Sequence, residues 1–84
     1  MPTISQFYGI LILMHISRKE HNPPHIHAIY GEYEATFAID SGELLHGVFP
    51  AKGTILVKEF IGINRSSLLD MWNSETYRKL PPLK

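Results

Sequence analysis

The sequence predicts a single α+β domain over residues 1–84. We expect an antiparallel meander of about four strands, followed by two helices packed on one face of the sheet. Apolar and polar residues alternate from His25 to Phe37 on both sides of a Gly31-Glu32 loop, which is typical of a hairpin. From Leu56 onward, apolar residues recur at helical spacing. Strands followed by helices are the usual order of an α+β domain.

The first strand is expected at Phe7–Ile16, where the chain is almost continuously apolar. A short run of this kind is typical of a strand that is covered on both faces, in the middle of a sheet. A buried helix is the alternative interpretation, but Gly9 and the alternate isoleucines favour a strand. Residues 17–20 would then form a polar turn.

The strand His25–Tyr30 should pair with a strand that begins at Tyr33. The two-residue loop has Gly31 in the first position of a type II′ turn, which fixes the register. This register puts the apolar side chains on one face, where the helices would cover them. The pairs are Tyr30–Tyr33, Ala28–Ala35 and Ile26–Phe37 on that face, and His25–Ala38, His27–Thr36 and Ile29–Glu34 on the other.

A fourth strand is expected at Leu44–Phe49, and two positions are open for His46 within it. A loop with an even number of residues puts His46 opposite Phe37 in the core. A three-residue loop, with Gly42 near the left-handed conformation, puts His46 opposite Ala38 on the histidine face. Burying an imidazole without a partner costs free energy, which favours the second arrangement.

Two helices should follow Pro50. The first would span Lys52–Ile63 and the second would run from Ser66 to about Tyr77, with Asn64 as its N-cap. Their apolar faces would be Leu56, Val57, Phe60, Ile61 and Ile63 in the first helix, and Leu68, Leu69, Met71 and Trp72 in the second. The basic, proline-rich tail cannot be helical past Leu80, so it either frays or docks a partner.

Composition excludes several classes of protein. Eight basic and eight acidic residues give a formal net charge of zero, which argues against general electrostatic binding of nucleic acid. Neither predicted helix is basic and no helix-turn-helix pattern is present, which argues against sequence-specific DNA recognition. The sequence has no cysteine, no secretion signal and no apolar run of membrane-spanning length. These features predict a cytoplasmic protein.

The most site-like segment is His21-Asn22-Pro23-Pro24-His25-Ile26-His27. Its two prolines stiffen the approach to the following strand. Strand geometry then places the imidazoles of His25 and His27 on one face, with their Cα atoms about 6.6 Å apart. Glu34 lies diagonally from His27, where its carboxylate could orient the imidazole.

Three interpretations fit this segment. Two imidazoles can act as general base and general acid in RNA cleavage without a metal. His25 and His27 would be that pair, with His21 assisting and Glu34 tuning His27, while Arg18, Lys19 or Arg65 holds the phosphate. Alternatively, His21, His25 and His27 could be three ligands of a zinc ion, with Glu34 as a further ligand or an outer-shell partner. In the third interpretation, the histidine face packs against a protein partner.

The landmarks of the chain also follow a familiar order. They are Met1-Pro2-Thr3-Ile4, Phe7 with Gly9-Ile10, the segment His21-x-Pro23-Pro24-His25-Ile26-His27, Tyr30-Gly31, Gly47, Pro50 and Trp72. This order resembles the bacterial family called domain of unknown function 4160. The resemblance implies a short protein that often sits beside a second small protein, in a toxin–antitoxin-type pair. It implies no activity.

Overall fold

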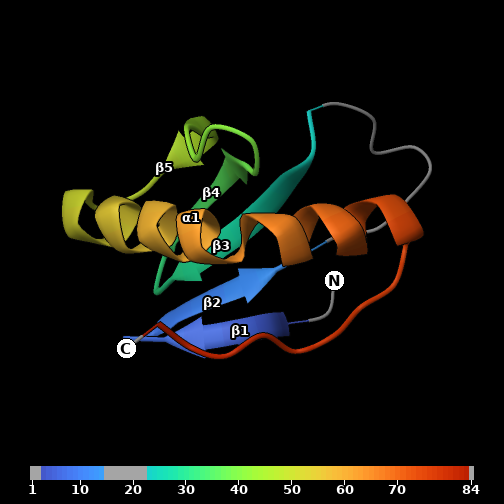
Figure 1. Ribbon diagram of the computed structural model, residues 1–84. Coiled ribbons are helices and arrows are strands. Elements are labelled where there is room, and N and C mark those ends of the chain that lie inside the picture. The colour runs from blue at the N-terminus through green and yellow to red at the C-terminus, as the bar shows by residue number, and fades with distance from the viewer. Residues whose placement is uncertain (1–2, 15–22, 84) are drawn as a thin grey trace.

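The computed structural model describes residues 3–14 and 23–83 and has an α+β fold (Figure 1). Five antiparallel strands form one sheet in the order β1-β2-β3-β4-β5, so each strand pairs with its neighbour in the sequence. One helix, α1, crosses a face of this sheet (Figure 1). The elements are β1 (Thr3–Phe7), β2 (Ile10–Leu13), β3 (His25–Tyr30), β4 (Tyr33–Ala38), β5 (Leu44–Val48) and α1 (Ala51–Ser74).

The prediction of one strand at Phe7–Ile16 is wrong, and this is why the described sheet has five strands and not four. Tyr8 and Gly9 turn the chain with φ of 48° and 79°, and Phe7 faces Ile10 across the turn. Two successive positive φ angles are what a type I′ hairpin turn requires. A non-glycine residue in this region costs about 1–2 kcal/mol, so tyrosine gives no sequence signal for such a turn.

The predicted register of the β3–β4 hairpin is confirmed. All six predicted pairs occur, from His25 opposite Ala38 to Tyr30 opposite Tyr33, and Gly31 has the expected positive φ, 59°. The residues that were expected on the helix-covered face are buried except at the turn, where Tyr30 and Tyr33 are exposed. The hairpin therefore segregates its two faces as its alternating sequence indicates.

Strand β5 pairs with β4 through an irregular register. Phe37 faces Leu44 but Thr36 faces His46, so Leu45 is an extra residue that forms a bulge. Both expected positions of His46, opposite Phe37 and opposite Ala38, are therefore wrong. His46 lies on the same face of the sheet as Thr36 and hence as His27, but its partner on β4 is two residues away from Ala38, the partner in the favoured prediction.

Gly47 allows β5 to approach β4 closely. Its φ is 90°, and a Cβ atom there would collide with the carbonyl oxygen of Glu34 and lie 3.0 Å from the Cα atom of Ala35. Only glycine meets both demands, because it has no Cβ and tolerates positive φ. The end of β5 is therefore fixed by this one residue.

In the described residues one helix follows the sheet, where two were expected. The expected break survives as a kink at Asn64, whose φ of −108° and ψ of 16° are not helical. Asn64 is not an N-cap: its side-chain Nδ2 donates to the carbonyl oxygen of Phe60 at 3.1 Å, one turn back. The helix continues to Ser74 and ends at Glu75, which is left-handed with φ of 56°, rather than near Tyr77.

The core lies between α1 and the sheet. The buried helix residues recur at helical spacing and are Gly53, Val57, Phe60, Ile61, Leu68 and Met71. The ring of Phe60 lies 5.0 Å from that of Phe7, and Leu69 and Trp72 pack against the same core while partly buried. Ile63 was expected on the apolar face, but this expectation is wrong because the residue is 69% exposed.

The tail after α1 docks on the protein itself. It returns beside β1 (Figure 1), where the Leu80 N–H donates to the carbonyl oxygen of Ile4 at 2.7 Å. Leu83 is buried in the core. The alternative of a frayed tail is therefore wrong for residues 76–83, and the tail covers the outer edge of β1.

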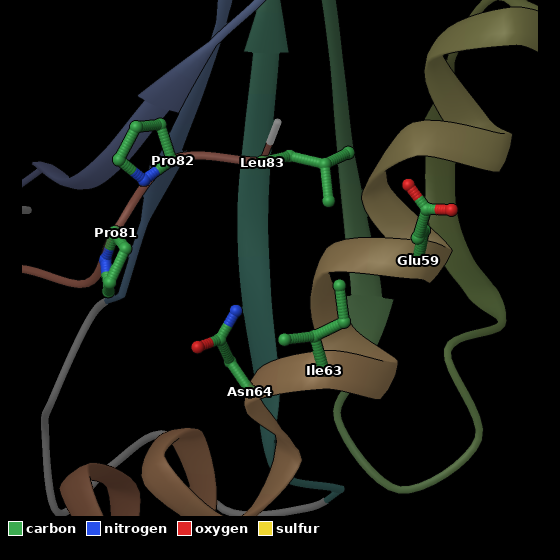
Figure 2. A pocket seen from close by; sticks show the side chains of 6 residues that line it. All are labelled: Glu59, Ile63, Asn64, Pro81, Pro82 and Leu83. Atoms are coloured by element: carbon green, nitrogen blue, oxygen red, sulfur yellow. The ribbon is translucent and has the colours of Figure 1, made fainter.

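The tail and the kinked part of α1 enclose a pocket of about 380 Å³. In Figure 2, Ile63 and Asn64 approach this pocket from the helix and the two prolines from the tail. The lining residues are Glu59, Ile63, Asn64, Pro81, Pro82 and Leu83.

Candidate functional site

The imidazoles of His25 and His27 lie side by side, as the strand spacing predicts. Their ring centroids are 5.3 Å apart, and the planes meet edge to face at 70°. The pairing of β3 with β4 puts small residues opposite them, Ala38 and Thr36. Two imidazoles at this distance can reach the same small group, as a general acid and a general base must.

His25 is held in one orientation. Its Nδ1 lies 2.8 Å from the carbonyl oxygen of Pro23, and because a carbonyl only accepts, Nδ1 carries the proton and donates. In a neutral ring, this bond selects the tautomer whose proton is on Nδ1. The preceding residue is also fixed, since the Pro24 carbonyl accepts from the Ile39 N–H at 2.9 Å.

The His25 ring is also covered by the helix. Its centroid lies 5.0 Å from that of Trp72, with 57° between the planes, and the residue is only 9% exposed. We had expected His25 on a face remote from the helix, so this contact corrects that expectation for the ring. An aromatic contact of this kind stabilises the fold by about 0.5–1.5 kcal/mol beyond its buried area.

His27 is half-buried in the middle of the sheet, with Leu13 opposite it on β2 and Thr36 opposite it on β4. Its Nε2 atom is shielded from solvent. Both histidines of the predicted acid–base pair are therefore largely covered by protein atoms.

Glu34, another predicted site residue, has an exposed side chain, as does His46, whose place on the histidine face was left open. Glu34 faces Ile29, diagonally from His27 as expected, but no hydrogen bond joins the two among the described residues. His46 extends the histidine row, because Thr36 lies between it and His27.

Arg65 has a structural contact instead of an open position. Its Nε donates to the carbonyl oxygen of Ile39 at 2.9 Å, which ties α1 to the end of β4. The remaining candidates, His21, Arg18 and Lys19, lie outside the described residues. Within residues 3–14 and 23–83, no three His, Asp or Glu side chains gather as a metal site would require.

Two features near the candidate site are not among those predicted from the sequence. Trp72 was assigned to the core, and its contact with His25 has no signal in the sequence. The second is a run of one charge: from Gly31 to Val48 the sequence has four acidic residues and no lysine or arginine. All four, Glu32, Glu34, Asp40 and Glu43, are exposed. Counting charges along the chain would have found this run.

Comparisons with known proteins agree with the resemblance seen in the sequence. Searches of curated proteins and of solved structures return no match. In the described part of the chain, α1 lacks the apolar length that a membrane crossing needs. The sequence model of one family matches residues 9–73, which is more than half of the chain. The chain therefore belongs to the family described as Domain of unknown function (DUF4160).

Proposed function

We propose that this protein is a protein-interaction module, one member of a toxin–antitoxin-type pair, and that a strand of its partner pairs with the outer edge of β5. The observation that carries the proposal is the exposure of β5. All five of its residues are exposed, including Leu44, Leu45 and Val48. An exposed apolar edge strand is a template for pairing with another chain.

The two edges of the sheet differ in their protection. The tail covers β1 through Leu80 and Pro81, which make hydrogen bonds to Ile4 and Ser5. The outer edge of β5 has no backbone hydrogen bonds to any of the residues that the structure describes. Natural edge strands are usually protected by lysine, proline or a covering segment, and β5 has only its bulge at Leu45. This asymmetry supports an edge that is kept open for a partner.

The charge of this region indicates the kind of partner. The exposed charged residues from Gly31 to Val48 are all acidic. A second copy of the chain would bring acidic side chains against acidic ones, which is unfavourable. We therefore expect a different protein, whose edge strand carries lysine or arginine.

The test is to produce the protein together with the small protein encoded beside its gene, and to measure the complex by calorimetry. Val48→Lys should weaken binding at least tenfold, about 1.4 kcal/mol, because an edge lysine opposes pairing. Ile63→Lys is the matched control, since the two side chains are 70% and 69% exposed. Equal affinity of both variants, or no complex with the wild type, would contradict the proposal.

Metal-independent RNA cleavage is the second candidate, and one observation favours it. In a neutral ring, the bond from His25 Nδ1 to the Pro23 carbonyl selects one tautomer, and the centroid of the His25 ring lies 5.3 Å from that of His27. A base held in one tautomer beside a potential acid is what 2′-hydroxyl attack requires. The coverage of His25 by Trp72 argues against open access for RNA, which is why partner binding ranks first.

This candidate is tested by inducing the wild type, His27→Ala and His46→Ala in cells and following growth and RNA integrity. His46→Ala is the control, because it removes an exposed imidazole from the same sheet face. In purified form, the wild type should show a bell-shaped pH profile, and His27→Ala should lose about 10²–10⁴-fold in rate. RNA that stays intact with the wild type would remove this candidate and leave the partner-binding proposal untouched.

A further inference from the structure

The end of the sheet away from the histidines contains a second concave site. The turns β1–β2 and β3–β4 lie at this end, next to the start of α1, and they border a pocket of about 500 Å³. Binding pockets for small molecules usually measure about 300–1,000 Å³. We call this the tyrosine pocket; it is lined by Tyr8, Ile10, Tyr30, Pro50, Ala51, Lys52, Gly53 and Leu56.

The aromatic wall of the tyrosine pocket depends on a glycine. Gly9 has φ of 79°, and a Cβ atom on it would lie 3.2 Å from Cε1 of Tyr30. The absence of that atom lets the Tyr30 ring rest against the β1–β2 turn. Tyr30 remains 43% exposed there, so the ring lines the pocket instead of filling it.

Tyr8 at the rim is in an unfavourable conformation. Its φ of 48° is in the left-handed region, which bulky residues rarely adopt. Glycine or asparagine would form the same turn with less strain. The ring makes an edge contact with Phe7, at 6.4 Å between centroids, yet the residue stays 60% exposed. Strain kept at an exposed aromatic residue is a feature of binding sites.

The charge of the tyrosine pocket indicates which kind of planar ligand would bind there. Lys52 is the one charged residue that lines it, and no lining residue is acidic. Two exposed aromatic rings suit a flat ring that stacks on them, and an ammonium group suits an anionic substituent on that ligand. The complementary small molecule is a flat heterocycle that carries a phosphate.

We propose that the tyrosine pocket binds a nucleoside phosphate, with the base stacked on Tyr8 and Tyr30 and the phosphate beside Lys52. This site is separate from the β5 edge and from the histidine pair. Tyr30 is five strand steps from His25, which corresponds to about 16 Å.

The test is an NMR titration of the ¹⁵N-labelled full chain with AMP, GMP, CMP and UMP, and with adenosine and inorganic phosphate alone. The nucleotides should shift the amide signals of Tyr8, Gly9, Tyr30 and Lys52. Tyr8→Asn keeps a residue that tolerates positive φ and removes the ring, and it should weaken nucleotide binding about 5- to 150-fold, the range for one base–aromatic stack. Lys52→Met should weaken AMP binding and leave adenosine binding unchanged.

Two matched controls separate the tyrosine pocket from general surface effects. Tyr77→Asn removes another exposed tyrosine, and Lys58→Met removes another lysine of α1; neither residue lines the pocket. Both controls should bind nucleotides like the wild type, and all variants should melt cooperatively. Nucleotides that shift none of these amides, or that bind Tyr8→Asn as tightly as the wild type, would overturn the proposal. So would inorganic phosphate that binds as tightly as AMP.

Discussion

Replacing Gly47 should destabilise the protein far more than replacing Gly31, although both glycines have positive φ. Gly31 has φ of 59°, and a Cβ atom on it would have no neighbour within 4 Å. Gly31→Ala therefore costs only the left-handed conformation, about 1–2 kcal/mol, less the roughly 0.4–1 kcal/mol gained by restricting the unfolded chain. We expect a net loss of about 1 kcal/mol.

At Gly47 the same conformational cost is joined by a steric one. The new Cβ would collide with the carbonyl oxygen of Glu34 and lie 3.0 Å from the Cα atom of Ala35. The backbone of β4 cannot move aside without breaking its hydrogen bonds to β5. Losing about two ladder hydrogen bonds, at about 0.5–1.5 kcal/mol each, adds about 1–3 kcal/mol. We therefore expect Gly47→Ala to cost about 2–4 kcal/mol in all.

Urea denaturation and thermal melting of the two variants measure this difference. For a domain of this size, about 1 kcal/mol corresponds to about 4–8 °C in Tm, so Gly47→Ala should melt at least about 8 °C below the wild type. Gly47→Ala should also lose the partner, because β5 is displaced, while Gly31→Ala should keep it. If Gly47→Ala and Gly31→Ala lower the free energy of unfolding by amounts that agree within about 0.5 kcal/mol, the close approach of β5 to β4 is refuted.

Two further variants test other contacts. His25→Ala should lower the free energy of unfolding by about 1–3 kcal/mol, measured by urea denaturation, because it removes the hydrogen bond to the Pro23 carbonyl and the contact with Trp72. The control His46→Ala should stay within about 0.5 kcal/mol of the wild type. Equal free energies of unfolding for the two variants would contradict the packing of His25. Leu83→Ala should cost about 2 kcal/mol, the low end for a buried leucine because a tail can readjust. The control Pro82→Ala changes an exposed neighbour in the tail and should hardly change the free energy of unfolding. If Leu83→Ala also leaves the free energy of unfolding unchanged, the tail does not stabilise the sheet.

The hairpin β3–β4 could be predicted from the sequence in full, because Gly31-Glu32 fixed the loop length and only one register segregates the apolar residues. The β1–β2 hairpin could not, because its turn uses Tyr8 where local preferences call for glycine or asparagine. The helix break was placed correctly at Asn64 but its extent was overestimated. Burial of Leu68 and Met71 carries the helix through the kink, which is a tertiary effect that propensity does not include.

The sequence predicted only the part of the candidate site that lies within one strand, β3. The spacing of His25 and His27 on β3 gave their common face and proximity, since strand geometry is local. The cover from Trp72 was not predictable, because it comes from a residue 47 positions away that is brought there by α1. The predicted partner of His46 on β4 was wrong by two residues, Ala38 instead of Thr36, because a bulge at Leu45 leaves no mark in the hydrophobic pattern.

The docking of the tail on β1 has a consequence for synthesis in the cell. The contact between Ser5 and Pro81 spans 76 residues, so at about 5–20 residues per second the ribosome delivers the tail about 4–15 s after β1. Hairpins form in about 1–10 μs, so the emerging sheet exists for seconds with the edge of β1 bare. A chain that stops before Leu80 keeps that edge permanently. We expect such truncated chains to aggregate, even though the hairpins are complete.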